Sequence, residues 1–436
     1  MKMTRRDFTK TVAVAGLAGA TTALGADRIL GTNERVRLGF IGVGGRGTYL
    51  LGLALGFDTV EVSAVCDIKP DRLDRALGLV EKSRSKRPAG YSAGPKDYRR
   101  LLERDDVDAV VIATPMQAHA VMSVDALNAK KHVLSEVAAA LTMDECWSLV
   151  HATEKSGRIY MLAENCCYYR QNLMVLRMVG QGLFGDLTFA ECGYVHDCRD
   201  YVFEAGGQLT WRGELARDHV GNLYPTHALG PVCHWLGINR GDRLVSLVAS
   251  TSAGKGLEHY VAKKFPADHP ARKIQFAVGD TTTTLIRTAQ GAVIDLRYDT
   301  ASARPHPSTT YFTLQGATAS YKDDGTQQQI WIEDKSKGYA WEPLAGYTRE
   351  FEHPLWQQSG EKASQTGHGG ADYFVVAQFV EAIRAGRPAP IDAYDAAAWS
   401  CIMPLSAASI RAGGAPQEIP DFTRGAWEKR KRMNLS

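Results

Sequence analysis

The sequence lacks the cysteine spacing that disulfide frameworks and zinc sites use. It has eight cysteines spread over the chain, none of which forms a Cys-x-x-Cys pair, and most stand among apolar residues. Zinc sites use closely spaced cysteines, and folding in the reducing cytoplasm before export would leave cysteines as thiols. We therefore predict eight free thiols and no metal site. The cysteines are Cys66, Cys146, Cys166, Cys167, Cys192, Cys198, Cys233 and Cys401.

The sequence also lacks an excess of charge of one sign. The formal net charge is +3, and the charged fraction of 23% is that of an ordinary globular protein. The basic run from Lys429 to Arg432 is short enough to be a solvated tail. We predict no nucleic-acid partner. A chain of 436 residues has room for two domains with sizeable cores.

The sequence also has no long apolar run, and the apolar stretch near its N-terminus is short. Arg5 and Arg6 precede Phe8 and Lys10, and an uncharged stretch of small and apolar residues covers 11–26. At about 16 residues this stretch is too short to span a bilayer. A basic region before a short apolar one is typical of a secretory signal, here resembling the twin-arginine type. We predict a twin-arginine signal peptide over 1–30, export to the periplasm or beyond, and no membrane span in the mature protein.

The next part of the chain alternates between strands and helices. Apolar strand-length segments lie at 36–44, 60–67, 108–114, 132–136 and 158–163. Helical segments lie between them, at 47–55, 70–83, 118–129 and 142–156, and the last should begin with Thr142 as its N-cap and Glu145 three residues on. This alternation predicts an α/β fold, with a doubly wound parallel sheet of the Rossmann type over 35–165.

A second domain, over 166–436, is rich in strands. We expect them at 187–196, 244–250, 274–289, 292–300 and 309–315. They predict an α+β domain with an open, mostly antiparallel sheet. Helices at 371–384 and 394–411 should pack back on the first domain. The uncovered face of such a sheet is a candidate for homo-oligomer contacts.

The first strand ends in a glycine motif that predicts a dinucleotide site. Gly42, Gly44 and Gly47 form a Gly-x-Gly-x-x-Gly pattern that includes Gly45 and Arg46. The pattern follows a strand and precedes a helix, whose N-terminus favours a pyrophosphate. Asp67 ends the next strand, where a carboxylate would accept hydrogen bonds from ribose hydroxyls and repel a 2′-phosphate. We predict NAD rather than NADP, although Arg46 is also placed to meet a phosphate.

Further cofactor contacts should come from the carboxyl ends of the later strands. An open α/β sheet binds its ligand at that edge. The residues there that we expect at the dinucleotide are Thr114, Met116, Gln117, His119, Glu136, Val137 and Asn165. Of these, Glu136 is expected to hold the nicotinamide ribose.

These features together resemble the glucose-fructose oxidoreductase and inositol dehydrogenase superfamily. A narrower set of blocks resembles family 109 of the glycoside hydrolases, whose founding activity is α-N-acetylgalactosaminidase. The blocks stand in order along the chain, at 136–140, 164–168, 192–194, 211–212, 222–227, 367–370, 390–395 and 420–425.

Three positions depart from the patterns that the resemblance leads one to expect. Val137 stands where dehydrogenases of the superfamily usually carry the proton-transferring Lys, and Leu223 stands where they tend to carry an Asp. Oxidation of an alcohol needs a base near the hydroxyl, so these losses argue against a simple dehydrogenase. His306 stands where family 109 leads us to expect a substrate-contacting Tyr, which leaves the sugar preference open.

The family 109 resemblance implies hydrolysis by temporary oxidation. Bound NAD would oxidise C3 of the sugar, the C2 proton would be removed, the C1 substituent eliminated, water added and the hydride returned, so the cofactor is tightly bound and recycled. His227 is the expected base for the 3-hydroxyl. Tyr168 and Tyr224 are candidates for C2 proton transfer or for assistance to the leaving group, with positioning as the alternative role. The residues expected around the sugar are Tyr194, Arg212, Tyr224, Pro225, Thr226, His227 and His306.

Two other functions stay open at this point. An oxidoreductase of the same fold would release a keto-sugar and need its NAD reoxidised. A sugar-binding protein would retain the fold without catalysis. Val137 and the segment 224–227 favour the glycosidase over the first, and the intact dinucleotide motif counts against the second.

Overall fold

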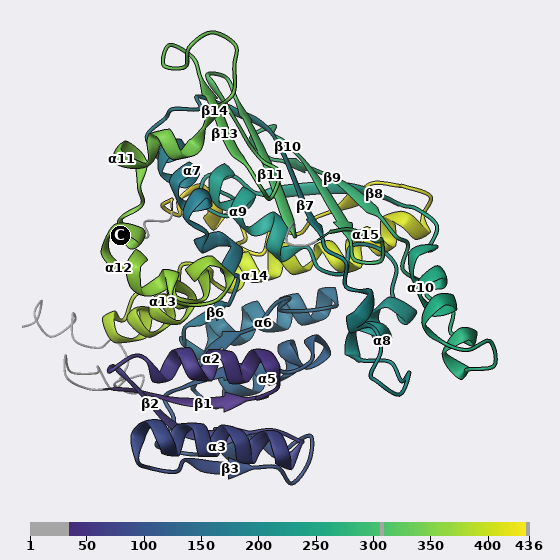
Figure 1. The fold of residues 1–436 in the computed structure, drawn as a ribbon. Helices are drawn as coiled ribbons and strands as arrows, with labels where there is room; N and C mark the ends of the chain where they lie inside the picture. Colours follow the sequence, from purple (N-terminus) through teal and green to yellow (C-terminus); the bar gives the residue numbers. More distant parts are fainter. Residues whose placement is uncertain (1–34, 306–308, 433–436) are drawn as a thin grey trace, which may run out of the picture. The chain divides into compact units, whose positions relative to one another are not determined.

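The computed structural model describes residues 35–305 and 309–432. The predicted signal peptide over 1–30 and His306 lie outside these ranges, so both stay predictions. Figure 1 shows the order of the elements along the chain.

The first sheet is parallel and has six strands, in the order β3-β2-β1-β4-β5-β6. The prediction of a doubly wound parallel sheet is confirmed. Its edge strand β3 escaped prediction because its three residues, Ala89, Gly90 and Tyr91, carry no apolar run. The strands are β1 (Val36–Ile41), β2 (Val60–Cys66), β3 (Ala89–Tyr91), β4 (Ala109–Ile112), β5 (His132–Ser135) and β6 (Tyr160–Leu162).

Helices connect these strands. The start of α6 has the capping box that the sequence suggests, because Thr142 and Glu145 each bind the other's backbone N–H. The helices are α2 (Gly45–Leu55), α3 (Pro70–Arg84), α4 (Tyr98–Leu102), α5 (His119–Asn128) and α6 (Met143–Ser156).

The second sheet has nine strands, in the order β14-β13-β12-β11-β7-β10-β9-β8-β15. Only the β7–β10 pair is parallel within the described ranges, so the prediction of a mostly antiparallel sheet is confirmed. The strands are β7 (Leu187–Val195), β8 (Leu244–Thr251), β9 (Thr282–Thr288), β10 (Val293–Asp299), β11 (Thr310–Gly316), β12 (Ala319–Asp323), β13 (Gln328–Ile332), β14 (Glu342–Pro343) and β15 (Gln417–Glu418).

Two expected elements were wrong in extent. The strand expected over 274–289 begins only at Thr282, because the N–H groups of Ala277 and Val278 bind the carbonyls of Arg217 and Ala216 instead of a sheet neighbour. The helix expected over 394–411 is two helices that meet at Cys401.

Helices cover one side of the second sheet and reach the first domain. Helix α9 packs on β7 and β11, α15 packs on β8, and α13 and α14 contact α2 and α6, beside which they lie in Figure 1. The helices are α7 (Arg170–Gly180), α8 (Trp211–Asp218), α9 (Thr226–Leu236), α10 (Gly256–Lys264), α11 (Thr348–Phe351), α12 (Pro354–Ser364), α13 (Ala371–Ala385), α14 (Ala393–Ser400) and α15 (Ile402–Arg411).

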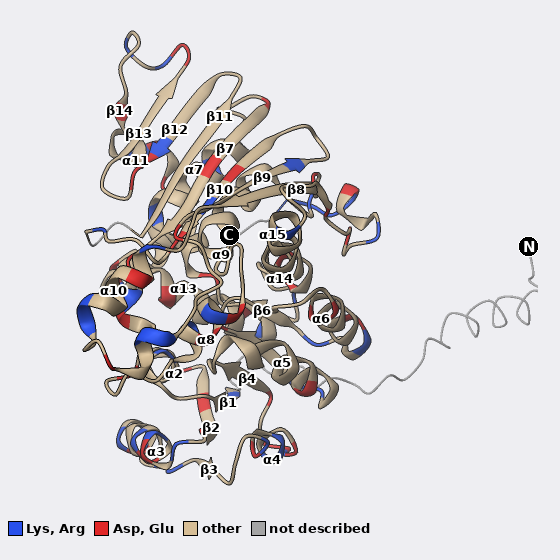
Figure 2. Ribbon diagram, turned by 90° about the vertical axis from the view of Figure 1, so that its right-hand side faces the viewer, with Lys and Arg blue, Asp and Glu red and all other residues tan. Residues whose placement is uncertain are grey.

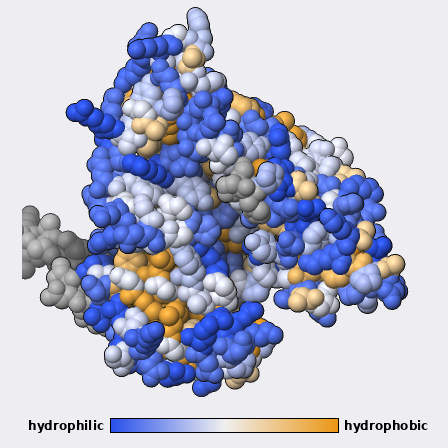
Figure 3. Space-filling view, viewed as in Figure 1, coloured by the Kyte–Doolittle hydropathy of each residue, from blue (hydrophilic) through white to orange (hydrophobic). Residues whose placement is uncertain are grey.

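Charged side chains of both signs are interleaved on the second sheet. Arg297 on β10 lies 3.7 Å from Glu191 on β7 and 3.8 Å from Asp295, and Figure 2 shows this alternation. Hydrophilic residues also cover most of the face drawn in Figure 3.

No helix of the described ranges is long and apolar enough to cross a membrane. All eight cysteines are buried and free.

Candidate active site

The glycine motif forms a tight turn between β1 and α2. Gly42 has a φ of +84°, and a Cβ there would lie 2.9 Å from the carbonyl oxygen of Ala113. A Cβ on Gly47 would lie 1.9 Å from the carbonyl oxygen of Gly42. Both positions therefore require glycine, one for its backbone conformation and one for the close approach of helix and turn.

The N-terminus of α2 is open to a phosphate group. Gly44 is its N-cap and supplies no side-chain cap, while a Cβ on Gly45 would meet nothing within 4 Å. The first N–H groups of a helix need partners, and a pyrophosphate suits them. Asp67 stands nearby at the end of β2, buried, and its carboxylate accepts the backbone N–H groups of Val43 and Lys69, each at 2.8 Å. These groups fit the pyrophosphate and adenine ribose of NAD.

His119 has a structural role at the strand ends. Its ring is buried, with Nδ1 2.9 Å from the carbonyl oxygen of Ala138 and Nε2 2.8 Å from that of Thr114. Burial lowers the pKa of His119. Both ring nitrogens face backbone, so the expected side-chain contact with the cofactor is not what the structure shows. The ring instead links the segments that follow β4 and β5.

Two residues that precede His119, Met116 and Gln117, contact the second domain. Gln117 donates to the carbonyl oxygen of Trp211 at 3.3 Å, and the buried Met116 lines the pocket described below. Val137 is buried after β5.

Arg46, Glu136 and Asn165 meet around an acid that the sequence interpretation did not single out, Asp372 at the start of α13. Arg46 Nε lies 2.7 Å from Glu136 Oε1, and its two terminal nitrogens lie 2.9 and 2.7 Å from the Asp372 carboxylate. Asn165 Nδ2 donates to Asp372 at 3.0 Å. These three expected cofactor contacts therefore form one polar cluster at the ends of β5 and β6, beside the start of α2.

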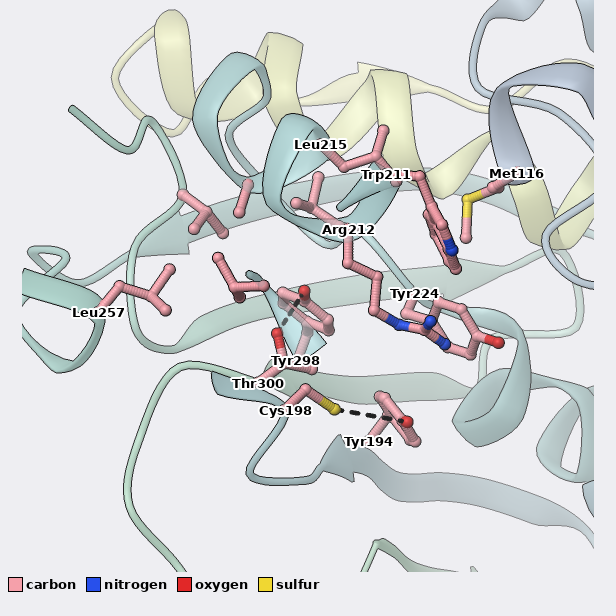
Figure 4. Close-up of a pocket in the computed structure, with 14 residues that line it drawn as sticks. Met116, Tyr194, Cys198, Trp211, Arg212, Leu215, Tyr224, Leu257, Tyr298 and Thr300 are labelled. Carbon is pink, nitrogen blue, oxygen red and sulfur yellow. Dashed lines mark hydrogen bonds between the residues drawn. The ribbon is translucent and has the colours of Figure 1, made fainter. Parts of the chain in front are cut away.

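A pocket is lined by Met116 of the first domain and by residues of the second domain (Figure 4). Aromatic and aliphatic side chains form most of its wall, together with one guanidinium. The lining residues are Met116, Tyr194, Cys198, Val202, Trp211, Arg212, Leu215, Ala216, Leu223, Tyr224, Leu257, Val278, Tyr298 and Thr300.

Three of the expected substrate residues pack together. The rings of Tyr194 and Tyr224 are stacked with centroids 5.0 Å apart, and His227 meets their edges at 5.4 and 4.9 Å. They come from β7, from the loop before α9 and from the first turn of α9. Pro225 is the N-cap of α9 and the buried Thr226 its first residue, so both fix the direction in which His227 leaves the helix.

The side chain of His227 is held by Glu164. Its Nδ1 lies 2.7 Å from Glu164 Oε1, and the Glu164 side chain is fully buried. Burial raises the pKa of Glu164, but the charge and hydrogen bond of His227 outweigh it and hold the pKa below its usual value. A charged Glu164 fixes hydrogen on Nδ1 and leaves Nε2 of His227 as the nitrogen free to act as a base.

Cys166 lies close enough to this pair to suggest a metal site. Ligand atoms of Glu164, Cys166 and His227 lie within 4.8 Å of one another. However, the Glu164–His227 distance is that of a direct hydrogen bond, and burial raises the pKa of the Cys166 thiol well above its usual value. A protonated thiol is a poor metal ligand, so these groups fit a hydrogen-bonded acid–base pair better.

Arg212 stands in the pocket without an acidic partner. Its guanidinium lies over the Trp211 ring, 4.1 Å from the centroid, and points toward Tyr224 (Figure 4). No carboxylate of the described ranges pairs with it. An arginine held by ring contacts keeps its five donors available for a ligand.

Tyr168 does not reach this pocket. Its side chain is fully buried, its ring stacks on Phe374 of α13 with centroids 6.4 Å apart, and its hydroxyl has no hydrogen-bond partner in the described ranges. Burial raises the pKa of Tyr168 well above its usual value. The expected catalytic role for Tyr168 is therefore at odds with its position, which is that of a core side chain.

Comparison with known proteins places this arrangement in a family. Residues 168–429 match the description "Glycosyl hydrolase 109, C-terminal domain", and residues 36–164 match "Oxidoreductase family, NAD-binding Rossmann fold". This chain belongs to glycoside hydrolase family 109. It is a glycosidase with an NAD-binding domain.

Relatives within family 109 are similar over their full length. An α-N-acetylgalactosaminidase of Tannerella forsythia is 36% identical, with 99% of each chain covered. A family 109 protein of Solibacter usitatus is 39% identical, again with 99% of each chain covered. Among solved structures, a levoglucosan dehydrogenase in complex with NADH has a TM-score of 0.69 at 19% identity and covers 89% of this chain and 100% of its own. That likeness concerns the fold.

Two acids of this site, Glu164 and Asp372, were not among the site residues predicted from the sequence. Glu164 lies two residues after β6, and the carboxyl end of a parallel strand is a position that suggests a role in a site. Asp372 carried no such signal, because it lies far along the chain and reaches the site only through the packing of α13 on α2.

Proposed function

We propose that this family 109 chain hydrolyses α-N-acetylgalactosaminides, with NAD bound tightly and reused within each catalytic cycle. The names of two relatives, from Tannerella forsythia and Shewanella oneidensis, support this substrate. The observation that carries the mechanism is the composition of the pocket. Its fourteen lining residues include no Asp or Glu. Most glycosidases place two carboxylates at the scissile bond; here Glu164, beside the pocket, is paired with His227, so we propose a different chemistry.

His227 is the proposed base for a sugar hydroxyl. Glu164 holds its Nδ1, which directs Nε2 toward the substrate. When bound, NAD supplies a hydride acceptor for the adjacent carbon, C3, and can return the hydride later. A histidine suits both directions, because it accepts the hydroxyl proton and can give it back near neutral pH.

Tyr224 is the proposed proton donor to the departing oxygen at C1. Burial raises the pKa of Tyr224, while the nearby charge of Arg212 lowers it. The net effect keeps the phenol protonated, as a hydrogen-bond donor must be. Arg212 and Tyr194 then orient the sugar or its N-acetyl carbonyl from the other walls of the pocket.

Export is part of the same proposal. A protein that leaves the cytoplasm folded takes its cofactor with it and finds little NAD outside to replace it. A cofactor that is regenerated in each cycle meets this condition. The predicted twin-arginine signal is tested by fractionating cells and sequencing the N-terminus of the exported protein.

The test of the function uses the purified protein without added cofactor. We expect it to release nitrophenol from nitrophenyl α-N-acetylgalactosaminide over many turnovers, with NAD found in the protein after denaturation. Accumulation of NADH and a keto-sugar, with no nitrophenol, would instead identify a dehydrogenase of the same fold. Nitrophenyl glycosides of other sugars and of the β-anomer define the preference.

A further inference from the structure

The start of α13 is tied to α2 through one buried carboxylate. Asp372 is fully buried and accepts hydrogen bonds from Arg46, from Asn165 at 3.0 Å and from His368 Nδ1 at 2.6 Å. Burial raises the pKa of Asp372, but the hydrogen bonds from His368 and Arg46 outweigh it and hold the pKa at about 2. The acid is therefore charged and depends on these partners.

The segment before Asp372 lies against the same helix. The backbone N–H of Gly367 donates to the Tyr49 hydroxyl at 2.6 Å, and the His368 ring meets the Tyr49 ring edge-on at 6.4 Å. His368, Gly369 and Gly370 have φ values of +50°, +60° and +91°. Glycine adopts such values freely, whereas His368 holds one with its ring in contact with Tyr49 and Asp372, so these contacts fix the position of His368.

These contacts converge where the nicotinamide half of the dinucleotide should lie. Arg46 is the second residue of α2, whose open N-terminus suits the pyrophosphate. Glu136 and Asn165, on which the cluster also depends, follow β5 and β6. In a doubly wound sheet the ligand lies outside these strand ends. The segment from Gly367 to Asp372 therefore borders the cofactor site.

Arg46 also balances charge at this border. It pairs with two carboxylates, Glu136 and Asp372, and its single positive charge reduces the negative charge that would otherwise face a pyrophosphate. Moving the segment away from α2 would leave Asp372 charged and without its partner. The charge-assisted hydrogen bonds from Arg46 therefore hold the segment against α2.

We propose that residues 367–372 form a latch, a segment that keeps NAD in place between catalytic cycles. Asp372 holds this segment against α2 through its hydrogen bonds with Arg46 and His368. The proposal rests on the proposed function and deepens it, since it names the residues that make the cofactor non-exchangeable. These residues position the cofactor and take no part in the chemistry at the sugar.

The test measures NAD rather than activity alone. The protein is purified as wild type and as Asp372→Asn, Arg46→Lys and His368→Gln, and its NAD content is determined after gel filtration. The rate of exchange with labelled NAD is then followed. We expect dissociation to rise by about tenfold in each latch variant, the effect of losing a hydrogen bond to a charged group. Added NAD should restore kcat with a raised KM for NAD.

Arg37→Lys is the matched control. Arg37 makes the same two-pronged contact with Asp108, and its side chain is 23% exposed against 27% for Arg46, but Asp108 precedes β4, at the opposite end of the sheet. It should lose stability without losing NAD. His368→Gln keeps the test valid if Asp372→Asn fails to fold, because His368 is 55% exposed.

Wild type and all latch variants retaining NAD equally would overturn the latch and leave the proposed function intact. A wild type that releases nitrophenol and contains no NAD would overturn both.

Discussion

The Glu164 carboxylate binds His227 in a place from which water is excluded, and this pair governs the base chemistry proposed for the site. Replacing Glu164 by Gln keeps the shape but removes the charge that fixes the His227 tautomer. We expect kcat to fall by about 100-fold or more, with the melting temperature changed far less. Glu352→Gln is the control, since Glu352 is also largely buried and paired with an arginine, Arg170, but lies outside the pocket. Equal losses of kcat in both variants would contradict the role of Glu164.

The two tyrosines that the sequence offered as catalytic should behave in opposite ways. Tyr224→Phe removes a hydroxyl in the pocket, so kcat should fall by about tenfold to 1,000-fold. Tyr168→Phe removes a buried hydroxyl that has no partner in the described ranges. This change should leave kcat within a few-fold and leave the free energy of unfolding unchanged or raise it. Steady-state kinetics and thermal melts of both variants decide between the two positions.

Retention of NAD should depend on pH through His368. The hydrogen bond to Asp372 raises the pKa of His368, and burial, Arg46 and Glu136 act on it too, with Tyr49 the other titratable side chain facing it. Because the pKa is raised, the charged contact is complete below about 6.5, the ordinary histidine value, and is lost as the pH rises through the folded-state pKa. We expect NAD exchange to quicken as the pH rises through the raised pKa of His368. His368→Gln should flatten this profile, and an unchanged profile would contradict the role of the charge.

At the scale of elements, α9 positions His227 only because Gly230 leaves room beside it. A Cβ on Gly230 would lie 2.9 Å from Cys167 Sγ, 3.0 Å from Glu164 Cγ and 3.1 Å from Trp399. The buried Glu164 would have to shift away from His227. Gly230→Ala should therefore lower kcat and cost about 1–3 kcal/mol of unfolding free energy, although alanine favours helices.

Gly78→Ala in α3 is the control for that change. A Cβ there meets nothing within 4 Å, so this substitution should stabilise the protein and leave kcat unchanged. Melting curves and kinetics of the two variants separate helix propensity from crowding. A Gly230→Ala variant with full activity would contradict this expectation, because Glu164 would then shift without disturbing His227.

The elements that could be predicted were those with a local signal. The alternation of apolar strands and helices indicated the parallel sheet, and the capping box at Thr142 marked the start of α6. Strands β12 and β13 alternate buried and half-buried residues, and β14 has only two residues. None of the three contains a continuous apolar run, so the sequence did not predict them. The segment 274–281 looked like a strand, but the N–H groups of Ala277 and Val278 donate to carbonyl oxygens of α8. This pairing depends on the tertiary structure and has no local signal in the sequence.

At the scale of the whole molecule, the site is made by long-range packing. Sequence patterns brought out Tyr194, Tyr224 and His227, which the fold brings together. They did not bring out Asp372, whose partner Arg46 lies 326 residues earlier. They also placed Tyr168 among the catalytic groups, because it lies in the block 164–168 that resembles family 109, whereas its side chain turns into the core.

The central claim is that the glycosidic bond is broken by way of temporary oxidation at the sugar. The most direct measurement is to hydrolyse nitrophenyl α-N-acetylgalactosaminide in deuterated water, with no added cofactor, and to analyse the released sugar. We predict deuterium at C2 of the product, nitrophenol in many-fold excess over protein, and no net NADH. Hydrolysis at the same rate with no deuterium at C2 would contradict the account.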